Sequence, residues 1–288
     1  MNCLIVGANG QLGLSLQEVL KTKKIEFLPL SRKELDVTDF LRVMEVCAKS
    51  RVDLIINAAA YTNVEQAEIE MDKAFLINES GARNLAIAAR ENNAKFIHFS
   101  TDYVFSGSRK SPWKVDSEVN PLSIYGKSKL AGEKAIMHEY ADNSIVIRTS
   151  WLYSPFGKNF YKTILNLALS SNNPINVVID QIGQPTNATD LANLAITAAE
   201  DKVPAGFYHG SNSGFTSWHD FAIEIFKLAG ADTDRVRAIT SKDLRNKAPR
   251  PEYSVLDNSK WLDFGVKLLD PWQESVSRAF QAIHETFS

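Results

Sequence analysis

The chain has 288 residues, of which 44% are hydrophobic and 23% are charged, and its formal net charge is −2 with a pI near 6.2. The length and composition are those of a globular protein with a large core or two unequal domains. Because the charge is nearly balanced, it provides no basic field for nucleic acid or an anionic membrane surface, and we expect neither as a partner. The sequence also lacks the roughly 18 uninterrupted apolar residues of a membrane-spanning helix.

The N-terminus, cysteines and histidines indicate the compartment and the absence of a metal. Residues 1–4 enter a strand-like pattern without the basic and apolar parts of a signal sequence, so we expect a cytoplasmic protein. Cys3 and Cys47 stand in apolar surroundings, which favours buried free thiols over a disulfide. The five histidines have no metal-ligand spacing, and each is expected to be structural.

A glycine-rich turn follows the first predicted strand. The apolar run 3–6 ends in GANGQLG at 7–13, and helical spacing of apolar residues continues to Leu20. Such a turn can simply connect two elements, but its place between a first strand and a helix favours nucleotide binding. Free amides at the helix N-terminus then bind the diphosphate. The residues expected at the cofactor are Gly7, Gly10, Gln11 and Leu12.

The second predicted strand, 25–30, ends in Ser31 and Arg32. A hydroxyl and a guanidinium there suit a ribose 2′-phosphate, which favours NADPH over NADH, whereas the alternative is a solvated arginine at a strand end. We expect 35–39 to be the loop after a third short strand, with Asp36 accepting from adenine and Val37 packing on it. Two further strands are predicted at 52–57 and 95–100, on either side of a long helix at 71–92. The fold class is therefore α/β, a Rossmann-type doubly wound parallel sheet.

A hydroxyl, a phenol and an ammonium are expected to meet beside the cofactor. Thr101 ends the strand at 95–100, and Tyr125 and Lys129 lie one helical turn apart on one face of a later helix. Tyrosine and lysine at this spacing are common on ordinary amphipathic helices. Near a nicotinamide, however, the three would form a carbonyl reductase: Thr101 binds the carbonyl oxygen, Tyr125 donates a proton, and Lys129 lowers the tyrosine pKa while binding the nicotinamide ribose. Tyr125 and Lys129 are thus also expected at the cofactor.

These features together resemble the extended short-chain dehydrogenases/reductases and, within them, the dTDP-4-dehydrorhamnose reductases. The strings that carry the second resemblance are NAAAYTNVEQAE at 57–68, STDYVFSG at 100–107, YGKSKLAGEKA at 125–135, RTSWLY at 148–153 and QIGQPT at 181–186. The resemblance spans nearly the whole chain. It implies reduction of the 4-keto group of a dTDP-6-deoxy-4-keto-hexose with NADPH, NADH being possible. It implies further cofactor contacts at Ala60, Tyr61, Thr62 and Phe99, and a nucleotide-sugar site at Thr101, Asp102, Tyr103, Trp151, Asn159 and Arg250.

Three of the implied substrate contacts have simpler interpretations. Trp151 would equally suit a hydrophobic core, Asn159 would suit the N-cap of the helix that follows it, and Arg250 would suit the surface.

Two departures concern the metal that some family members hold at a dimer interface. Ser15 and Thr189 stand where those members have glutamates, so we expect no metal and a monomer or a weak homodimer without the metal-bridged interface.

Two other functions share this fold. A sugar-nucleotide dehydratase would carry a glutamate after Asp102 for elimination, and Tyr103 stands there instead. An epimerase would retain tightly bound NAD, and a non-catalytic regulatory subunit would lose part of the catalytic set. We divide the chain into a cofactor-binding domain at 1–205 and a smaller substrate-binding lobe at 206–288, with part of 150–190 lining the substrate cleft.

Overall fold

The computed structural model describes the whole chain except residues 202, 245–246 and 288. Its centre is a six-stranded parallel sheet in the order β10-β5-β4-β3-β1-β2. The predicted α/β class is confirmed. The strands are β1 (Asn2–Val6), β2 (Glu26–Leu30), β3 (Leu54–Asn57), β4 (Lys95–Thr101), β5 (Ser144–Thr149) and β10 (Gly206–His209).

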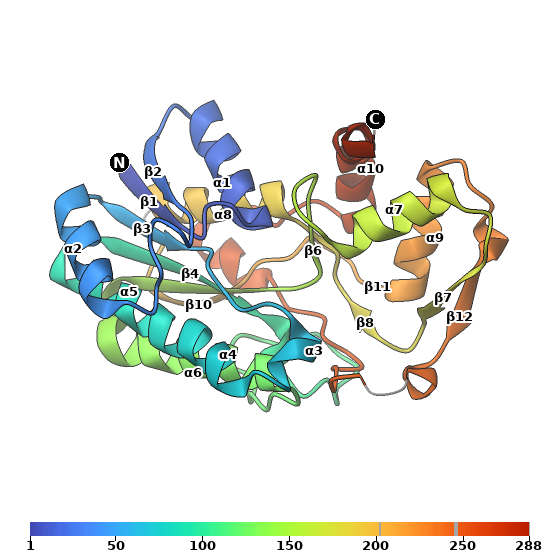
Figure 1. Ribbon diagram of the computed structural model, residues 1–288, viewed down its shortest axis with the longest axis horizontal. Coiled ribbons are helices and arrows are strands. Elements are labelled where there is room, and N and C mark those ends of the chain that lie inside the picture. The colour runs from blue at the N-terminus through green and yellow to red at the C-terminus, as the bar shows by residue number, and fades with distance from the viewer. Residues whose placement is uncertain (202, 245–246, 288) are drawn as a thin grey trace.

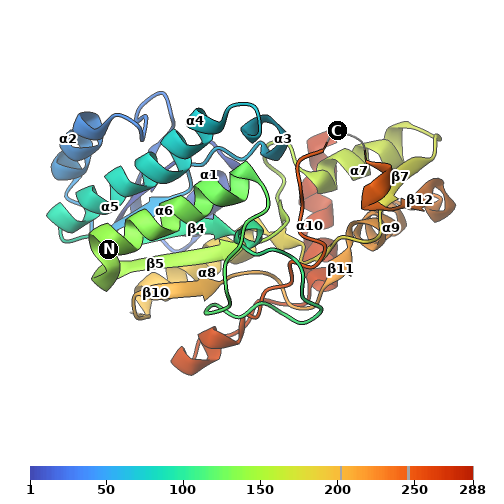
Figure 2. The same ribbon diagram turned by 90° about the horizontal axis from the view of Figure 1, so that it is seen from below.

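Helices cover both faces of this sheet (Figures 1 and 2). On one face lie α1 (Gln11–Thr22) and α8 (Ala188–Glu200), which share one apolar core with the strands. On the other face lie α2 (Phe40–Ser50), α5 (Ala82–Glu91) and α6 (Ile124–Tyr140). The central strands are continuous apolar runs because both of their faces are buried.

The helix predicted at 71–92 is present in three segments. These are α4 (Met71–Phe75), a π-helical turn at Leu76–Gly81, and α5, and the short helix α3 (Val64–Ala67) precedes them. A Cβ at Gly81 would come within 2.5 Å of the Val37 side chain, so glycine permits close packing there.

The prediction of a third strand before residues 35–39 is wrong. This segment forms consecutive turns, in which Glu34 accepts from the Ser31 amide at 2.7 Å and Asp36 accepts from the Thr38 amide at 3.0 Å. These side chains satisfy backbone donors that a strand would pair with a neighbour. The sheet therefore ends at β2, and the strand predicted at 52–57 is β3.

A smaller lobe, on the right in Figure 1, packs α7 (Phe160–Ser170), α9 (Trp218–Leu228) and α10 (Trp272–His284) around an aromatic core. Its strands form three pairs, each stabilised by only a few ladder bonds: β7 (Ile175–Val178) with β12 (Val236–Ile239), β8 (Ile182–Gly183) with β11 (Thr216–Ser217), and β6 (Leu152–Tyr153) with β9 (Thr186–Asn187).

The boundary expected before residue 206 does not agree with this arrangement. Gly206–His209 is β10, which pairs with β5 at the edge of the main sheet, whereas α7 and β7 lie in the smaller lobe. The chain therefore crosses between the lobes more than once. An apolar strand pattern alone does not say which sheet a strand joins.

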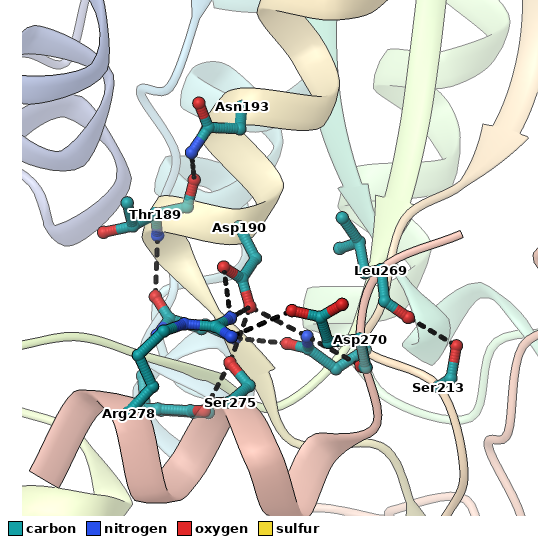
Figure 3. Close-up of polar contacts among 11 residues, drawn as sticks. Thr189, Asp190, Asn193, Ser213, Leu269, Asp270, Ser275 and Arg278 are labelled. Atoms are coloured by element: carbon teal, nitrogen blue, oxygen red, sulfur yellow. Dashed lines mark hydrogen bonds and ion pairs between the residues drawn. The ribbon is translucent and has the colours of Figure 1, made fainter. Parts of the chain in front are cut away.

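A polar cluster ties α10 to the start of α8 (Figure 3). The Asp190 carboxylate accepts from both the Arg278 guanidinium at 2.9 Å and the Ser275 hydroxyl at 2.6 Å. Arg278 also pairs with Asp270 at 2.8 Å. No helix among the described residues has the length and apolar character needed to cross a lipid bilayer.

Candidate active site

The glycine turn is built for close approach of a ligand. Gly7 has φ +81°, and a Cβ there would stand 2.5 Å from the Ala59 amide nitrogen. A Cβ at Gly13 would stand 2.4 Å from the Gly7 carbonyl oxygen. The N-cap of α1, Gly10, offers no side-chain cap, and the first turn of α1 carries no acidic residue. The helix amides are thus free for an anion, which fits the diphosphate of a dinucleotide.

Two adjoining cavities extend from this turn along the carboxyl ends of the strands. The first, of about 460 Å³, is lined by Gly7, Asn9, Arg32, Asp36, Val37, Tyr61 and Lys73, among others. The second, of about 480 Å³, is lined by Gln11, Leu12, Phe99, Thr101, Tyr125, Lys129 and Trp151, among others. Both are lined by Gly10, Ala58, Ala59, Ala60 and Thr62, so they form one cleft. Its volume and its position at the carboxyl ends of the strands suit a dinucleotide and a substrate beside it.

The first cavity holds the groups expected around adenine and its ribose. The Arg32 side chain is 71% exposed and lies 3.5 Å from the Asp36 carboxylate. Hydrogen bonds from Thr38 lower the pKa of Asp36, so it is anionic at neutral pH. Ser31 is buried and does not line the cavity. The sequence prediction missed Lys73, a second cation on this wall, whose ammonium lies 2.7 Å from Glu70.

The predicted trio of Thr101, Tyr125 and Lys129 meets in the second cavity. Thr101 ends β4, and Tyr125 lies in the first turn of α6 beside it. The start of α6 is fixed by Ser123, whose hydroxyl accepts from the Gly126 amide at 3.2 Å. A Cβ at Gly126 would lie 2.3 Å from the Tyr103 carbonyl oxygen, so glycine lets the helix contact the chain after β4. This contact brings the phenol to the threonine.

The electrostatics of the trio differ from the expectation. Burial raises the pKa of Tyr125 to about 12, and the only opposing influence is the hydrogen bond with Thr101. Burial also lowers the pKa of Lys129 to about 8. Burial therefore dominates the pKa of Tyr125, and the lowering of this pKa by Lys129 stays a prediction. The phenol is neutral at physiological pH, which is the form that can donate a proton.

Asp102 and Tyr103 line the same cavity, as the resemblance implied. The Thr101 hydroxyl donates to Asp102 Oδ1 at 3.1 Å, and burial raises the pKa of Asp102 to about 7. The Tyr103 ring meets the Tyr125 ring edge-on, with centroids 5.6 Å apart. A carboxyl group that titrates near neutrality therefore lies beside the trio.

Trp151 lies on the wall of the second cavity and also contacts the aromatic core of the smaller lobe. Its φ of +42° is unusual for a bulky side chain. The indole stacks on Trp218 of α9, with centroids 3.6 Å apart. Gly183 makes room for it, because a Cβ there would lie 2.5 Å from the indole. The sequence prediction missed Trp218, although it lies in an aromatic-rich segment.

Asn159 and Arg250 do not line either cavity. Asn159 is the N-cap of α7, with Oδ1 accepting from the Lys162 amide at 2.9 Å and Nδ2 donating to Gln11 Oε1 at 2.8 Å. Arg250 pairs with Glu65 at 2.8 Å. The simpler interpretation of Asn159 as a helix cap is thus the observed one, and its amide is already occupied. Lys158, which the prediction missed, lines the second cavity instead.

The comparison with known proteins agrees with this geometry. Residues 1–285 match the family described as the RmlD substrate binding domain. The chain belongs to this family. A dTDP-4-dehydrorhamnose reductase of Streptomyces griseus is 39% identical over 284 residues, covering 97% of this chain and 93% of the relative. The predicted resemblance is confirmed.

Two solved structures of the same kind superpose closely on this RmlD-family chain. A dTDP-4-dehydrorhamnose reductase of Clostridium acetobutylicum has a TM-score of 0.94 and 39% identity, covering 99% of this chain and 100% of its own. A dTDP-4-dehydrorhamnose reductase of Bacillus anthracis, in complex with NADP, has a TM-score of 0.93 and 38% identity, covering 97% and 98%.

The positions at which a metal was considered carry no carboxylate in this RmlD-family chain. Ser15 is fully buried in α1, and Thr189 lies in the first turn of α8 (Figure 3). The neighbouring Asp190 is occupied by Arg278 and Ser275. Within the described part of the chain, no three His, Cys, Asp or Glu side chains converge as metal ligands would.

Proposed function

We propose that this RmlD-family protein is an NADPH-dependent reductase of the 4-keto group of a dTDP-6-deoxy-4-keto-hexose, converting dTDP-4-dehydro-L-rhamnose to dTDP-L-rhamnose. The observation that carries the proposal is the single cleft in which the glycine turn adjoins Thr101, Tyr125 and Lys129. The full-length similarity to reductases of this name supports the substrate.

The cofactor, when bound, supplies the hydride. The protein supplies binding and orientation. The amides at the start of α1 bind the diphosphate, and Arg32 pairs with the 2′-phosphate of NADPH, in exchange for its contact with Asp36. Lys73 adds positive charge on the same wall, and NADH, which lacks that phosphate, loses both contacts.

Thr101 and Tyr125 act on the substrate carbonyl. The Thr101 hydroxyl binds the 4-keto oxygen and holds it next to the phenol. Tyr125 donates its proton as negative charge develops on that oxygen, and Lys129 in its ammonium form stabilises the phenolate left behind. Trp151 and Trp218 form the wall on which the sugar nucleotide packs.

A dehydratase is the nearest alternative, because it shares the cofactor fold and the Tyr-Lys pair. Elimination of water needs a second carboxylate next to Asp102. The residue there is Tyr103, a phenol whose pKa is raised by burial, so it cannot serve as that base near neutral pH. Asp102 is the one carboxylate among the residues that line the second cavity in the described structure. This favours reduction over elimination.

The assignment is tested by following NADPH oxidation at 340 nm with the dTDP-4-keto-6-deoxy sugar generated in the cuvette. We expect substrate-dependent oxidation that Tyr125→Phe abolishes. Tyr140→Phe is the matched control, because Tyr140 lies at the far end of the same helix and does not line the cleft, and it retains activity. Wild-type oxidation no faster than that of Tyr125→Phe refutes the reductase. Bound oxidised cofactor with substrate-dependent epimerisation would support an epimerase.

We also propose a cytoplasmic monomer or weak homodimer without a metal-bridged interface. The buried, unpaired thiols of Cys3 and Cys47 support a reducing compartment. The lack of carboxylates at Ser15 and Thr189 supports the absence of a bridging metal. Light scattering with and without a chelator tests the oligomeric state, and a chelator-sensitive dimer would contradict it.

A further inference from the structure

Lys129 is almost completely enclosed by protein. Its side chain is 2% exposed, and its amine donates to the Phe99 carbonyl oxygen at 2.7 Å. The second contact of the amine is His98 Nε2, at 3.1 Å. His98 lies on β4, points to the same side of the sheet as α6, and is 1% exposed. The histidine expected to be merely structural is therefore in direct contact with the proposed catalytic lysine.

The other ring nitrogen of His98 contacts Asn57, the last residue of β3. Asn57 Nδ2 lies 2.9 Å from His98 Nδ1. Asn57 Oδ1 accepts from the Ala59 amide at 3.0 Å. A continuous buried chain thus runs from the Ala59 amide through Asn57 and His98 to Lys129.

The direction of every hydrogen bond in this series of buried groups follows from its first member, the Ala59 amide. The Ala59 amide can only donate, so the Asn57 atom facing it is the oxygen, and the Asn57 NH₂ faces His98. His98 Nδ1 must then accept, and a neutral imidazole carries its proton on Nε2. Burial and the charge of Lys129 hold the pKa of His98 well below its usual value, so the ring is neutral. His98 Nε2–H therefore points at the Lys129 amine.

An N–H donor directed at a lysine is satisfied only by a neutral amine. The neutral amine has one lone pair and two N–H groups, so it can accept from His98 while donating to Phe99. An ammonium has no lone pair, and its N–H would face another N–H. A buried donor without an acceptor is costly.

We propose that Asn57 and His98 are positioning residues that present an N–H donor to Lys129 and so favour its neutral amine. The effect adds to burial, which acts in the same direction. Their role extends the proposed reductase function, and its kinetic consequence rests on that function, whereas the hydrogen-bond polarity does not.

Other charged and titratable groups surround this chain. Glu133, one turn along α6, favours the ammonium of Lys129. Its carboxylate is itself paired with Arg148 of β5 at 2.7 Å, which limits this influence. Tyr125 of α6, with Asp102 and Tyr103 after β4, lines the same cavity. Unlike these groups, His98 contacts the Lys129 amine directly, through its Nε2.

The consequence is a lysine that releases its proton within the working pH range. After Tyr125 has given its proton to the product oxygen, the ammonium of Lys129 stabilises the phenolate, and loss of the lysine proton removes that charge. The neutral amine is the form that His98 satisfies, so the chain lowers the cost of releasing the proton.

The polarity is tested directly by the tautomer of His98, measured from ¹⁵N shifts of the histidine-labelled protein with His98→Gln for assignment. We expect the Nε2–H tautomer from pH 6 to 8. His209 is an internal control, because its Nδ1 faces the Asp257 carbonyl at 3.1 Å and must carry the proton there. The two buried rings should thus be opposite tautomers. An Nδ1–H or doubly protonated His98 would overturn the proposal even if the enzyme is a reductase.

Asn57→Asp reverses the donor–acceptor direction of the hydrogen bonds from residue 57 through His98 to Lys129. Its carboxylate accepts from both the Ala59 amide and His98 Nδ1–H, leaving a lone pair on Nε2 for an ammonium at Lys129. We expect His98 to switch tautomer. We also expect the alkaline fall in kcat to occur at a pH about one to two units higher. Asn166→Asp, a like substitution at an exposed position of α7 away from both cavities, should leave both unchanged. A shift of this fall without a tautomer switch would show a charge effect alone and would contradict the proposal. Absence of any turnover would refute the reductase and leave the tautomer result standing.

Discussion

The Glu133–Arg148 ion pair is expected to be the most sensitive polar contact behind the cleft. Glu133 lies on α6 one turn beyond Lys129, and Arg148 lies on β5. The two groups form a bidentate pair at 2.9 and 2.7 Å, and their side chains are only 1% and 4% exposed. The Arg148 guanidinium also donates to the Val115 carbonyl at 3.1 Å and lies 5.1 Å from the Phe105 ring. Replacing Glu133 by alanine would leave this guanidinium buried without its partner.

The size of the effect follows from that burial. Removing one member of a buried pair costs about 3–5 kcal/mol, because the remaining charge is uncompensated, whereas an exposed pair contributes about 0–1 kcal/mol. We therefore expect Glu133→Ala to lower the free energy of unfolding by about 3–5 kcal/mol. The double variant Glu133→Leu with Arg148→Met removes both charges and should recover much of that loss, because no buried charge remains.

The assay is urea unfolding followed by far-ultraviolet circular dichroism, with midpoints and slopes fitted for each variant. Glu45→Ala is the control: Glu45 forms ion pairs with Arg42 and Lys49 on the exposed face of α2, and we expect no resolvable change. A Glu133→Ala midpoint equal to that of the wild type would refute the reasoning. A double variant less stable than Glu133→Ala would show that packing, rather than the unpaired charge, sets the cost.

Three further outcomes are expected. Turnover should fall as the pH rises through the pKa of Lys129, about 8, because the ammonium is the form that stabilises the phenolate. Glu133→Gln should move this fall to lower pH, because Glu133 favours the ammonium. A pH–rate profile measures both effects, and a shift to higher pH in Glu133→Gln would contradict the role of Glu133. Gly7→Ala should weaken NADPH binding about tenfold or more, because Gly7 has a positive φ and an added Cβ would collide with the Ala59 amide. Titration calorimetry measures the affinity, and an unchanged value would exclude the glycine turn as the diphosphate site. Arg32→Ala should raise KM for NADPH by about 10-fold to 100-fold and leave that for NADH nearly unchanged, and steady-state kinetics with equal effects on both would remove Arg32 as the 2′-phosphate contact.

Local spacing was sufficient to predict the parts of the site that come from one strand end or one helix turn. The glycine turn, the end of β4 at Thr101 and the Tyr125–Lys129 pair each depend on a few neighbouring residues. In a parallel α/β sheet the carboxyl ends of the strands lie at one edge, so these parts meet there. The sequence could therefore indicate the cleft without any knowledge of packing.

The rest depended on contacts between distant segments. Lys129 meets His98 and Phe99 from β4, and burial by these neighbours, rather than sequence spacing, sets its protonation. Trp218 reaches the cleft from the smaller lobe. Asn159 was expected at the substrate, but its amide is held by Gln11 at 2.8 Å. The position of β10 was missed because a four-residue strand carries no signal for the sheet that it joins.

The stacked indoles of Trp151 and Trp218 give the protein an optical reporter of its own cleft. Trp151 follows β5 of the main sheet, and Trp218 begins α9 of the smaller lobe, with rings 3.6 Å apart and an interplanar angle of 10°. Chromophores this close couple electronically, so the pair contributes to near-ultraviolet circular dichroism and quenches its own fluorescence. A sugar nucleotide that separates or covers the rings changes both signals. Ligand binding can therefore be followed in the unlabelled protein without any turnover.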